Sequence, residues 1–508
     1  MIIIDSDKLD FINIENYFNH PLEFQNQKLD ITKEEYIRKI DIIKNYIANG
    51  DTYQINFTTK TKFDFKGNIV SLFIQGIFNQ SAKYSAFINF TNEYVLSFSP
   101  ELFFETDYNF VSSCPMKGTL KRKDSFGKEK IIIKEFLKDK KNLAENVMIV
   151  DLLRNDIGKI SEINSVKVNK LFNLEKYETL FQLTSTVTGK LINNKLSNTI
   201  KNLFPCGSIT GAPKIRSMEI ISELEKSNRG IYTGAIGIIQ DHKAVFNIPI
   251  RTMIINKSSN KGELGLGSGI VWDSNAENEY KEVLLKGEFI NPEQNYFELL
   301  ETFLFEDGNY FLLNYHLKRL EESAKFFLFN FNRKLLNNEL SKIANQLLKE
   351  KKYKIRILLN KWGNIKTDIS EINEIKNRIK VRLSNSIRSK KEKFLYHKTN
   401  YRPWDKEYVK AQQTGFDEIL FVNKNNQILE GAITNIIVKQ SGIYYTPPLN
   451  LGILNGCYRQ FLLDEKKIEE KILTVRDLKN ADEIILCNSI RKEMIISEFD
   501  FNYKRIAK

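Results

Sequence analysis

A break in the hydrophobic pattern at residues 287–296, GEFINPEQNY, divides the chain into two parts. Pro292 and its polar neighbours cause this break. A chain of 508 residues is also too long to fold around one hydrophobic core. We therefore expect two domains, residues 1–290 and residues 296–508.

Both parts are predicted to mix helices with strands. Apolar residues recur at helical spacing from Leu143 to Ile157, with Gly158 as the stop. The helix predicted over 273–287 begins with Ser274 and Glu277 as a capping box. Segments rich in β-branched and aromatic residues predict strands over 231–239, 244–255, 354–360, 417–423 and 482–489. A further helix is predicted over 311–329. Such a mixture predicts the α+β class for both domains.

The net charge of +13 would by itself suit a nucleic-acid binder. The lysines are spread along the chain and interleaved with acidic residues, so a solvated lysine-rich surface explains the charge better. We expect no nucleic-acid partner, although a small anionic substrate would suit a basic protein.

The sequence also disfavours membranes and disulfides. No apolar run is long enough to cross a bilayer, and the opening MIIIDSDKLDF lacks the features of a secretion signal. The cysteines form no CxxC pair, which disfavours a disulfide framework or a zinc site; they are Cys114, Cys206, Cys457 and Cys487. We expect a cytoplasmic protein without a membrane partner.

Two groups of charged residues could carry chemistry. Glu279, Glu282 and Lys286 share one face of a predicted helix. One interpretation is a solvated helix face with an ion pair between Glu282 and Lys286. The other is a functional site, in which the carboxylates bind Mg²⁺ and the lysine binds an anionic group of a substrate. Lys117 lies between a proline and a Gly-Thr turn, and is either a surface residue or a nucleophile. A nucleophilic lysine needs a lowered pKa, which Lys121, Arg122 or a metal could provide if they folded back.

Eight segments follow one another in the first domain. They are GDTYQINFT at 50–58, SPELFFE at 99–105, PMKGT at 115–119, ENVMIVDLLRND at 145–156, FPCGSITGAPK at 204–214, YTGAIG at 232–237, IRT at 250–252 and GSGIVWDSNAENEYKE at 267–282. Together they resemble the chorismate-utilising family, which contains anthranilate, aminodeoxychorismate and isochorismate or salicylate synthases. The resemblance covers residues 34–288 and implies an anthranilate synthase-like fold.

Lys117 indicates the subclass. Aminodeoxychorismate synthases of this family carry P-x-K-G-T, whereas anthranilate synthases carry alanine in place of the lysine. The resemblance implies that Lys117 attacks C2 of chorismate and expels the C4 hydroxyl, which Glu101 protonates. Ammonia then attacks C4 and releases the lysine.

The resemblance also implies a metal site and a substrate site. Glu145 and Glu282 match the Mg²⁺ ligands, with Glu279 close by. The substrate-binding set is Gly207, Ser208, Thr210, Tyr232, Arg251, Gly269 and Lys286. Within it, Arg251, Lys286 and the amides around Gly207, Ser208 and Gly269 would hold carboxylates.

Two features depart from the family. Gln182 stands where many relatives have a histidine, which puts any role of that histidine in doubt. The region before the resemblance is short, so we expect no tryptophan binding.

In the second domain, the residues around His316 and Arg319 alone predict a hairpin and an amphipathic helix, with both side chains on the surface. Five segments nevertheless resemble the fold-type-IV pyridoxal-phosphate enzymes over residues 297–500. They are LLETFLFEDGNYFLLNYHLKRLEESA, YHKTNYRPWD, ILEGAITNII, GILNGCYRQ and CNSI. That family contains branched-chain and D-amino-acid aminotransferases and aminodeoxychorismate lyase.

By this resemblance, Lys398 forms the Schiff base with pyridoxal 5'-phosphate and Glu430 pairs with the pyridine nitrogen. Thr302 matches the threonine near the reacting carbon of the lyases. The residues implied to hold the phosphate are Arg319, the backbone at Cys457 and Tyr458, and Ser489. The LNG segment followed by Arg459 and Gln460 resembles the lyase version of the motif more than the aminotransferase version.

Together the resemblances imply synthesis of 4-amino-4-deoxychorismate from chorismate and ammonia, followed by elimination of pyruvate to give 4-aminobenzoate for folate biosynthesis. The sequence shows no Cys-His-Glu amidotransferase segment, so a separate glutamine amidotransferase subunit would supply the ammonia. A homodimer through the second domain is compatible with the resemblance. The enzyme alternative is an anthranilate synthase-type domain fused to a branched-chain or D-amino-acid aminotransferase-like domain. A binding protein with degenerate sites is disfavoured because Lys117, Glu145, Glu282 and Lys398 are all present.

Overall fold

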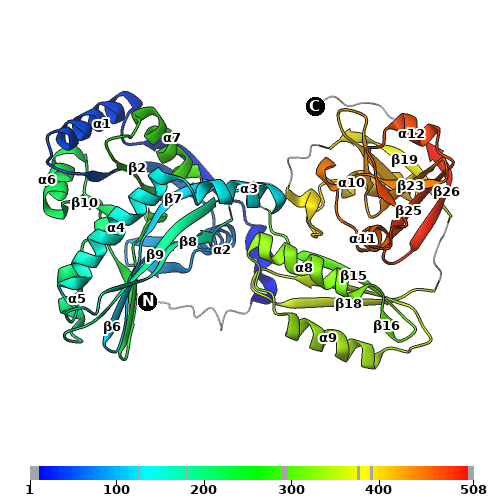
Figure 1. Ribbon diagram of the computed structural model, residues 1–508, viewed down its shortest axis with the longest axis horizontal. Helices are drawn as coiled ribbons and strands as arrows, with labels where there is room; N and C mark the ends of the chain where they lie inside the picture. Colours follow the sequence, from blue (N-terminus) through cyan, green and yellow to red (C-terminus); the bar gives the residue numbers. More distant parts are fainter. Residues whose placement is uncertain are drawn as a thin grey trace. The chain divides into compact units, whose positions relative to one another are not determined.

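The computed structural model describes residues 11–123, 126–178, 180–288, 295–373, 378–388 and 393–501. The chain separates into two compact units. The first comprises Met1–Arg122 and Glu129–Gln294, and the second comprises Lys123–Lys128 and Asn295–Lys508. Pro292, at the predicted boundary, lies outside the described residues. Both units contain helices and strands (Figure 1), so the α+β prediction is confirmed.

The first unit contains two sheets. One has the strand order β1-β2-β14-β13-β4-β3, with β10 also paired to β2. Its strands are β1 (Glu23–Leu29), β2 (Gln54–Lys66), β3 (Tyr84–Asn89), β4 (Glu93–Ser99), β10 (Gly211–Ala212), β13 (Thr252–Asn256) and β14 (Lys261–Ile270). The long antiparallel ladder between β14 and β2 runs from Lys261 opposite Asp64 to Ile270 opposite Ile55.

The second sheet has the order β11-β12-β5-β6-β9-β7, with β8 also paired to β9. Its strands are β5 (Leu102–Asp107), β6 (Phe110–Cys114), β7 (Met116–Lys121), β8 (Lys167–Lys176), β9 (Leu180–Lys190), β11 (Ile236–Gln240) and β12 (Lys243–Asn247). The helix α4 (Lys140–Gly158) packs on this sheet, where the Ser185 hydroxyl donates to Asn146 Oδ1 at 2.6 Å. It ends at Gly158 as predicted.

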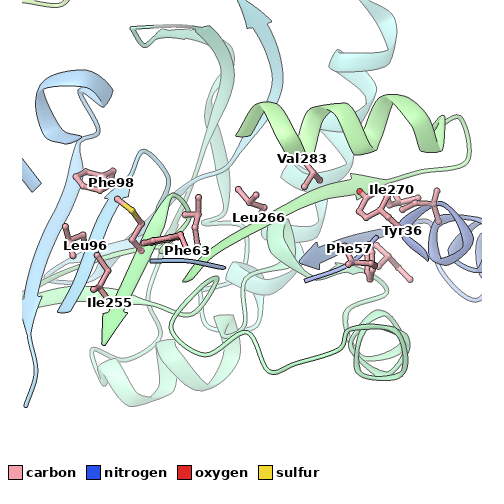
Figure 2. Close-up of a cluster of buried hydrophobic side chains, with 14 of the residues drawn as sticks. Tyr36, Phe57, Phe63, Leu96, Phe98, Ile255, Leu266, Ile270 and Val283 are labelled. Atoms are coloured by element: carbon pink, nitrogen blue, oxygen red, sulfur yellow. The ribbon is translucent and has the colours of Figure 1, made fainter. Parts of the chain in front are cut away.

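Helices α1 (Lys33–Ala48) and α7 (Ala276–Gly287) pack on the first sheet. α1 begins where Thr32 accepts a hydrogen bond from the Glu35 amide, and its buried residues Tyr36, Ile40 and Ile43 recur at helical spacing. Figure 2 shows Tyr36 of α1, Ile270 of β14 and Val283 of α7 within the buried apolar cluster of this layer. The core thus fixes α7 against β14.

Three local predictions for this unit are wrong. The strand predicted over 231–239 begins only at Ile236, as β11, because residues 231–234 form turns. The segment 244–255 is not one strand, because β12 belongs to the second sheet and β13 to the first. Pro249 lies at the crossing, where it has no N–H to continue a ladder.

The predicted capping box of α7 is also wrong. Asn275 is the N-cap and accepts from the Asn278 amide, while the Ser274 hydroxyl donates to Glu279 Oε1 at 2.9 Å.

The second unit contains two further sheets, with orders β16-β15-β17-β18 and β21-β20-β19-β26-β25-β22-β23-β24. The strands of the first are β15 (Leu299–Glu306), β16 (Asn309–Tyr310), β17 (Tyr353–Leu359) and β18 (Ile365–Glu371). Those of the second are β19 (Arg378–Ile387), β20 (Glu418–Val422), β21 (Ile428–Gly431), β22 (Asn435–Gln440), β23 (Ile443–Thr446), β24 (Glu469–Glu470), β25 (Glu483–Asn488) and β26 (Lys492–Asp500). The helices that matter below are α8 (Leu313–Phe327), α10 (Asp405–Gln413) and α11 (Cys457–Asp464).

Across the described ranges, every helix is too short or too polar to span a bilayer.

Candidate active sites in the two units

Lys117 projects from β7, and its amine is enclosed by protein although the side chain as a whole is partly exposed. Burial lowers the pKa of Lys117, and the positive charge of Lys286 lowers it further. The negative charges of Glu101, Glu145 and Glu282 act on the same amine and raise its pKa. Five predicted site residues from four separate segments are therefore in electrostatic contact.

Glycines in β14 make room for this amine. A Cβ placed on Gly269 would lie 3.1 Å from Lys117 Nζ and 2.9 Å from Gln54 Nε2. Gly265 lies on the same face of the strand, because side chains alternate along it, and a Cβ there would collide with the ring of Tyr232. Lys117 and Tyr232 thus approach the same bare face of β14.

The neighbours that the sequence suggested as the cause of a lowered Lys117 pKa are engaged elsewhere or exposed. Arg122 pairs with Glu129 at 2.6 Å and also donates to the carbonyl of Tyr177. Lys121 is exposed at the end of β7. Burial and Lys286 are the causes instead.

Glu101 lies between β4 and β5 and is 5% exposed. The Ser208 hydroxyl donates to its Oε1 at 2.9 Å, and the Met116 amide also donates to this carboxyl. Burial raises the pKa of Glu101, and it outweighs the opposing effects of Ser208 and Lys117. A buried carboxyl whose pKa is raised thus lies beside a buried amine whose pKa is lowered.

The segment 206–212 brings Ser208 to this position. A short 3₁₀ turn, Gly207–Ile209, is held by the Thr210 hydroxyl, which donates to the carbonyl of Cys206 at 3.0 Å. A Cβ on Gly207 would collide with Leu152 of α4, so the turn can approach the helix this closely only with glycine at that position.

Lys286 and Glu282 form the ion pair that their spacing suggested, with Nζ and Oε1 2.7 Å apart. Lys286 also donates to the carbonyl of Gly267 at 2.8 Å. The neighbouring Glu279 is more deeply placed, and burial together with the charge of Glu282 raises its pKa. α7 thus brings two carboxylates and one ammonium to β14.

Arg251 stands at the start of β13 with a positive φ of 50°. Its Nη1 donates to Gln80 Oε1 at 2.8 Å, and its guanidinium lies 5.9 Å from the centre of the Tyr177 ring. Burial lowers the pKa of Arg251. Its assignment to a substrate carboxylate stays a prediction, as does that of Tyr232.

Gln182, the residue that departs from the family, lies on β9 opposite Thr119 of β7. Its Oε1 is buried and accepts no hydrogen bond from the described residues. An unsatisfied buried acceptor of this kind is costly unless a ligand or water donates to it.

In the second unit, Lys398 Nζ donates to Thr302 Oγ1 at 3.0 Å. The carbonyl of Lys398 also accepts from the Leu300 amide at 3.0 Å, which ties this loop to β15. Burial lowers the pKa of Lys398 to about 8. The predicted pair Lys398 and Thr302 is therefore brought together.

The expectation that His316 and Arg319 are surface residues is wrong. His316 is 1% exposed, and both contact Glu301, the neighbour of Thr302 on β15. Arg319 donates from Nε and Nη2 to the two Glu301 oxygens at 2.8 and 2.7 Å, and His316 Nδ1 lies 2.7 Å from Oε2. Burial alone would raise the pKa of Glu301, but Arg319 and His316 hold it well below its usual range. The amphipathic pattern of α8 cannot show that the strand β15 supplies the carboxylate of Glu301 to these two side chains.

Arg319 also connects α8 to the beginning of α11, since its Nη1 donates to the carbonyl of Asn455 at 3.2 Å. Cys457 and Tyr458 open α11 and are both buried, and the Tyr458 hydroxyl donates to Glu493 at 3.0 Å. Burial raises the pKa of the Cys457 thiol to about 12. Ser489 follows β25 and is also buried.

Glu430 lies on β21, where burial raises its pKa to about 7. Its Oε1 accepts from Arg388 Nη1 at 3.1 Å, and its Oε2 accepts from the Leu454 amide at 3.0 Å. No motif recognised in the sequence contains Arg388, whose guanidinium lies 3.3 Å from the centre of the Phe421 ring. The Nε and Nη2 of Arg388 are buried and donate to no described residue.

A family comparison decides the identity of the first unit. Residues 7–292, more than half of the chain, match the family model for chorismate binding enzymes. The chain belongs to the chorismate binding enzyme family. Residues 298–499 match the family model for amino-transferases of class IV. Both resemblances drawn from the sequence motifs are therefore confirmed.

Relatives of this chorismate binding enzyme carry more than one name. A probable chloroplastic aminodeoxychorismate synthase of Oryza sativa subsp. japonica is 38% identical over 51% of this chain and 29% of its own length. An anthranilate synthase component 1 of Haloarcula marismortui is 37% identical over 51% of this chain and 53% of its own. Aminodeoxychorismate synthase component 1 of Salmonella typhimurium is 35% identical over 52% and 59%. The chain thus spans less than two thirds of the length of these relatives.

The carboxylates of the chorismate binding domain fit a divalent cation. Oxygen donors are the ligands that Mg²⁺ prefers, and Glu279 lies close enough to Glu282 for their charges to raise its pKa. A cation there would relieve this repulsion. Glu145 acts on the same Lys117 amine as Glu282 and would complete the set.

The class IV domain fits pyridoxal phosphate. It offers a buried amine at Lys398 and a buried carboxyl at Glu430, with unsatisfied donors on Arg388 beside that carboxyl. Arg319 lies next to the N-terminus of α11, where a phosphate is favoured by backbone N–H groups. Glu301, His316 and Cys457 also place potential metal ligands within 4.8 Å of one another. The Arg319 guanidinium already occupies both oxygens of Glu301, which favours an anion-binding cluster over a metal site.

A second residue missed in the sequence is Glu418 of β20. It is 1% exposed and accepts from the amides of Ala432 and Ile433 at 2.9 and 3.1 Å and from the Thr434 hydroxyl at 2.9 Å. Because these donors follow directly after Gly431, the last residue of β21, Glu418 fixes the end of the strand that carries Glu430.

Proposed function

We propose that the first domain replaces the C4 hydroxyl of chorismate with ammonia to make 4-amino-4-deoxychorismate, through a covalent bond to Lys117. The observation that carries this proposal is the convergence of the Lys117 amine, which lies against Gly269 of β14, with the buried carboxyl of Glu101. Burial shifts their pKa values in opposite directions, down for Lys117 and up for Glu101. Their mutual attraction favours the charged forms, but burial of both groups outweighs it. Each shift favours the neutral form that the reaction needs, an amine that can attack and a carboxyl that can donate a proton.

The chemistry proceeds in two displacements. Lys117 Nζ attacks C2, both conjugated double bonds of the ring shift, and the C4 hydroxyl departs as water with a proton from Glu101. The alkylated lysine nitrogen then returns a proton to Glu101. Ammonia then attacks C4, both double bonds shift back, and the C2–N bond to Lys117 breaks as the lysine nitrogen takes up the proton that the new C4 amino group loses. The overall change exchanges one hydroxyl for one amino group and releases one water.

Glu145, Glu279 and Glu282 would hold Mg²⁺, which would supply positive charge for a substrate carboxylate. Arg251, Lys286 and the amides at Gly207, Ser208 and Gly269 would bind the remaining carboxylate charge, with Thr210 and Tyr232 lining the same substrate. Guanidinium groups suit planar carboxylates because both can form two parallel hydrogen bonds.

We propose that the second domain eliminates pyruvate from 4-amino-4-deoxychorismate and gives 4-aminobenzoate for folate biosynthesis. Pyridoxal phosphate, when bound, supplies an electron sink. Lys398 Nζ would hold the cofactor and then move a proton, with Thr302 Oγ1 orienting that nitrogen. Glu430 would pair with the pyridine nitrogen, while Arg319, Ser489 and the amides of Cys457 and Tyr458 would hold the phosphate.

The ammonia would come from a separate glutamine amidotransferase subunit. This proposal is supported by the name of the Salmonella relative, which is a component 1. A cytoplasmic location and a homodimer through the second domain complete the proposal.

Product analysis tests the function as a whole. Purified protein is incubated with chorismate, ammonia, Mg²⁺ and pyridoxal phosphate, and we expect 4-aminobenzoate and pyruvate in equal amounts. Anthranilate as the aromatic product would favour the alternative of an anthranilate synthase-type enzyme, a name that the Haloarcula relative carries.

Glu282→Gln is expected to raise the Mg²⁺ concentration needed for half-maximal synthase activity by at least about tenfold. The substitution keeps the shape of the side chain but removes the charge that a hard cation needs. Glu277→Gln is the matched control, since Glu277 lies on the same helix but pairs with Lys33 at 2.8 Å. The synthase rate is measured against Mg²⁺ concentration, and an unchanged curve for Glu282→Gln would rule out its role as a ligand.

Cofactor capture is expected to depend on pH with a midpoint near the pKa of Lys398, about 8. Only the neutral amine attacks an aldehyde, and at pH 7 about one tenth of such a group is neutral, compared with about one in 2,500 for an ordinary lysine. The rate of visible-absorbance gain after adding pyridoxal phosphate to cofactor-free protein should rise about tenfold per pH unit below 8 and then level off. A rate that kept rising to pH 10, as for a free lysine derivative, would contradict the lowered pKa.

A further inference from the structure

Three buried side chains form a chain of hydrogen bonds that ends at the acid of the first site. Cys206 Sγ lies 3.3 Å from Ser208 Oγ, and Ser208 Oγ donates to Glu101 Oε1 at 2.9 Å. Cys206, Ser208 and Glu101 are 3%, 4% and 5% exposed, so water has little access to any of them. Cys206 and Ser208 flank Gly207 in the turn that packs against α4.

The hydrogen bond from Ser208 to Glu101 sets the direction of this chain, because it uses the only proton of the serine hydroxyl and leaves the Cys206 thiol as the donor to Ser208. A serine hydroxyl has one proton and can either donate to a carboxyl or accept from a protonated one. Burial raises the pKa of the Cys206 thiol to about 12, so the sulfur keeps its proton. With the S–H donating to Ser208, the serine proton is directed to Glu101.

This direction matters for the acid. Glu101 can protonate the departing hydroxyl only if its own proton is not engaged by Ser208. If the Ser208 hydroxyl could rotate freely, its oxygen could accept a hydrogen bond from protonated Glu101. The proton of Glu101 would then point at Ser208 and not at the substrate. A serine that accepts from the Cys206 thiol and donates to Glu101 disfavours this arrangement.

We propose that Cys206 is a positioning residue that acts through Ser208 to keep the proton of Glu101 available to the substrate. This inference rests on the proposed role of Glu101 as the acid. Cys206 also packs in an apolar cluster with Leu153, Leu203 and Ile209, and a role in packing alone is the competing explanation.

Two variants separate these explanations. Cys206→Ala removes the donor and is expected to lower kcat for amino-product formation about two- to tenfold, with KM for chorismate unchanged. Cys206→Ser keeps a donor at the same position and is expected to retain kcat within about twofold of the wild type. An equal loss of kcat in both variants, or a loss in neither, would overturn the proposal.

Infrared spectroscopy tests the geometry without turnover. The S–H stretch absorbs in a region free of other protein bands, and the difference between wild type and Cys206→Ala isolates the band of Cys206. Ser208→Ala should shift this band to higher frequency, because the thiol loses its acceptor. Cys487→Ala, which removes a buried thiol in the other unit, should leave it in place.

The infrared measurement tests the hydrogen-bond chain, and the product analysis tests the proposed function, so the two claims can be contradicted independently. Wild-type protein that makes no amino product from chorismate contradicts the proposed function. Active wild-type protein whose Cys206 band does not respond to Ser208→Ala contradicts the hydrogen-bond chain alone.

Discussion

Lys117→Ala is expected to lower 4-aminobenzoate formation from chorismate and ammonia by at least about a thousandfold, the scale of losing a covalent nucleophile. Alanine has no atom that can form the bond to C2, so the C4 hydroxyl would have to be displaced in one step. Conversion of added 4-amino-4-deoxychorismate should be unchanged, because Lys398, Thr302 and Glu430 all belong to the other unit. Both activities are measured on the same preparation by separating 4-aminobenzoate and anthranilate.

Lys121→Ala is the matched control for this variant. Lys121 ends the same strand but is exposed, so its removal should leave both activities within about twofold of the wild type. Normal 4-aminobenzoate formation by Lys117→Ala would show that the amine is not the nucleophile. Anthranilate from Lys117→Ala would show instead that the lysine selects the site of amination.

Lys398→Ala is expected to abolish both the visible absorbance of bound pyridoxal phosphate and at least about 99.9% of the lyase activity, as expected for a residue that carries the cofactor. Chorismate and ammonia should then yield 4-amino-4-deoxychorismate in solution. Addition of a separate active lyase should restore 4-aminobenzoate. Lys406→Ala on α10 is the control, because that lysine is exposed.

The same preparation shows how the intermediate travels. Fusion raises the local concentration of the second site around the first, but a small molecule still escapes by diffusion. An excess of inactive lyase that binds the intermediate should therefore slow 4-aminobenzoate formation by the wild type. If no concentration of this trap slowed it, the intermediate would not pass through bulk solvent.

The sequence predicted best those elements in which one periodicity dominates. The helix over 311–329 appears as α8, and the strand over 417–423 appears as β20. The segment 244–255 failed because its apolar residues continue through Pro249 while the hydrogen-bond partners change from one sheet to another. A residue pattern carries no information about which sheet a strand joins.

Candidate site residues could be named from the sequence where a motif contains them, but their structural partners could not. Lys117, Glu101, Lys398 and Glu430 each stand in a recognised segment, and their burial and neighbours are consistent with the predicted roles. Arg388, by contrast, contacts Glu430 from 42 residues away in sequence. Glu301 likewise pairs with a guanidinium 18 residues along the chain. Such pairs come from tertiary packing, and only an alignment or a structure reveals them.

Each candidate site lies within one unit of a single chain. On the proposed function, every molecule carries one synthase site and one lyase site, so gene expression cannot alter their ratio. The standing amount of 4-amino-4-deoxychorismate then depends on the turnover of the first site relative to the kcat/KM of the second. In such a chain, selection can keep a reactive intermediate scarce by making the lyase site more efficient, but not by making more of it.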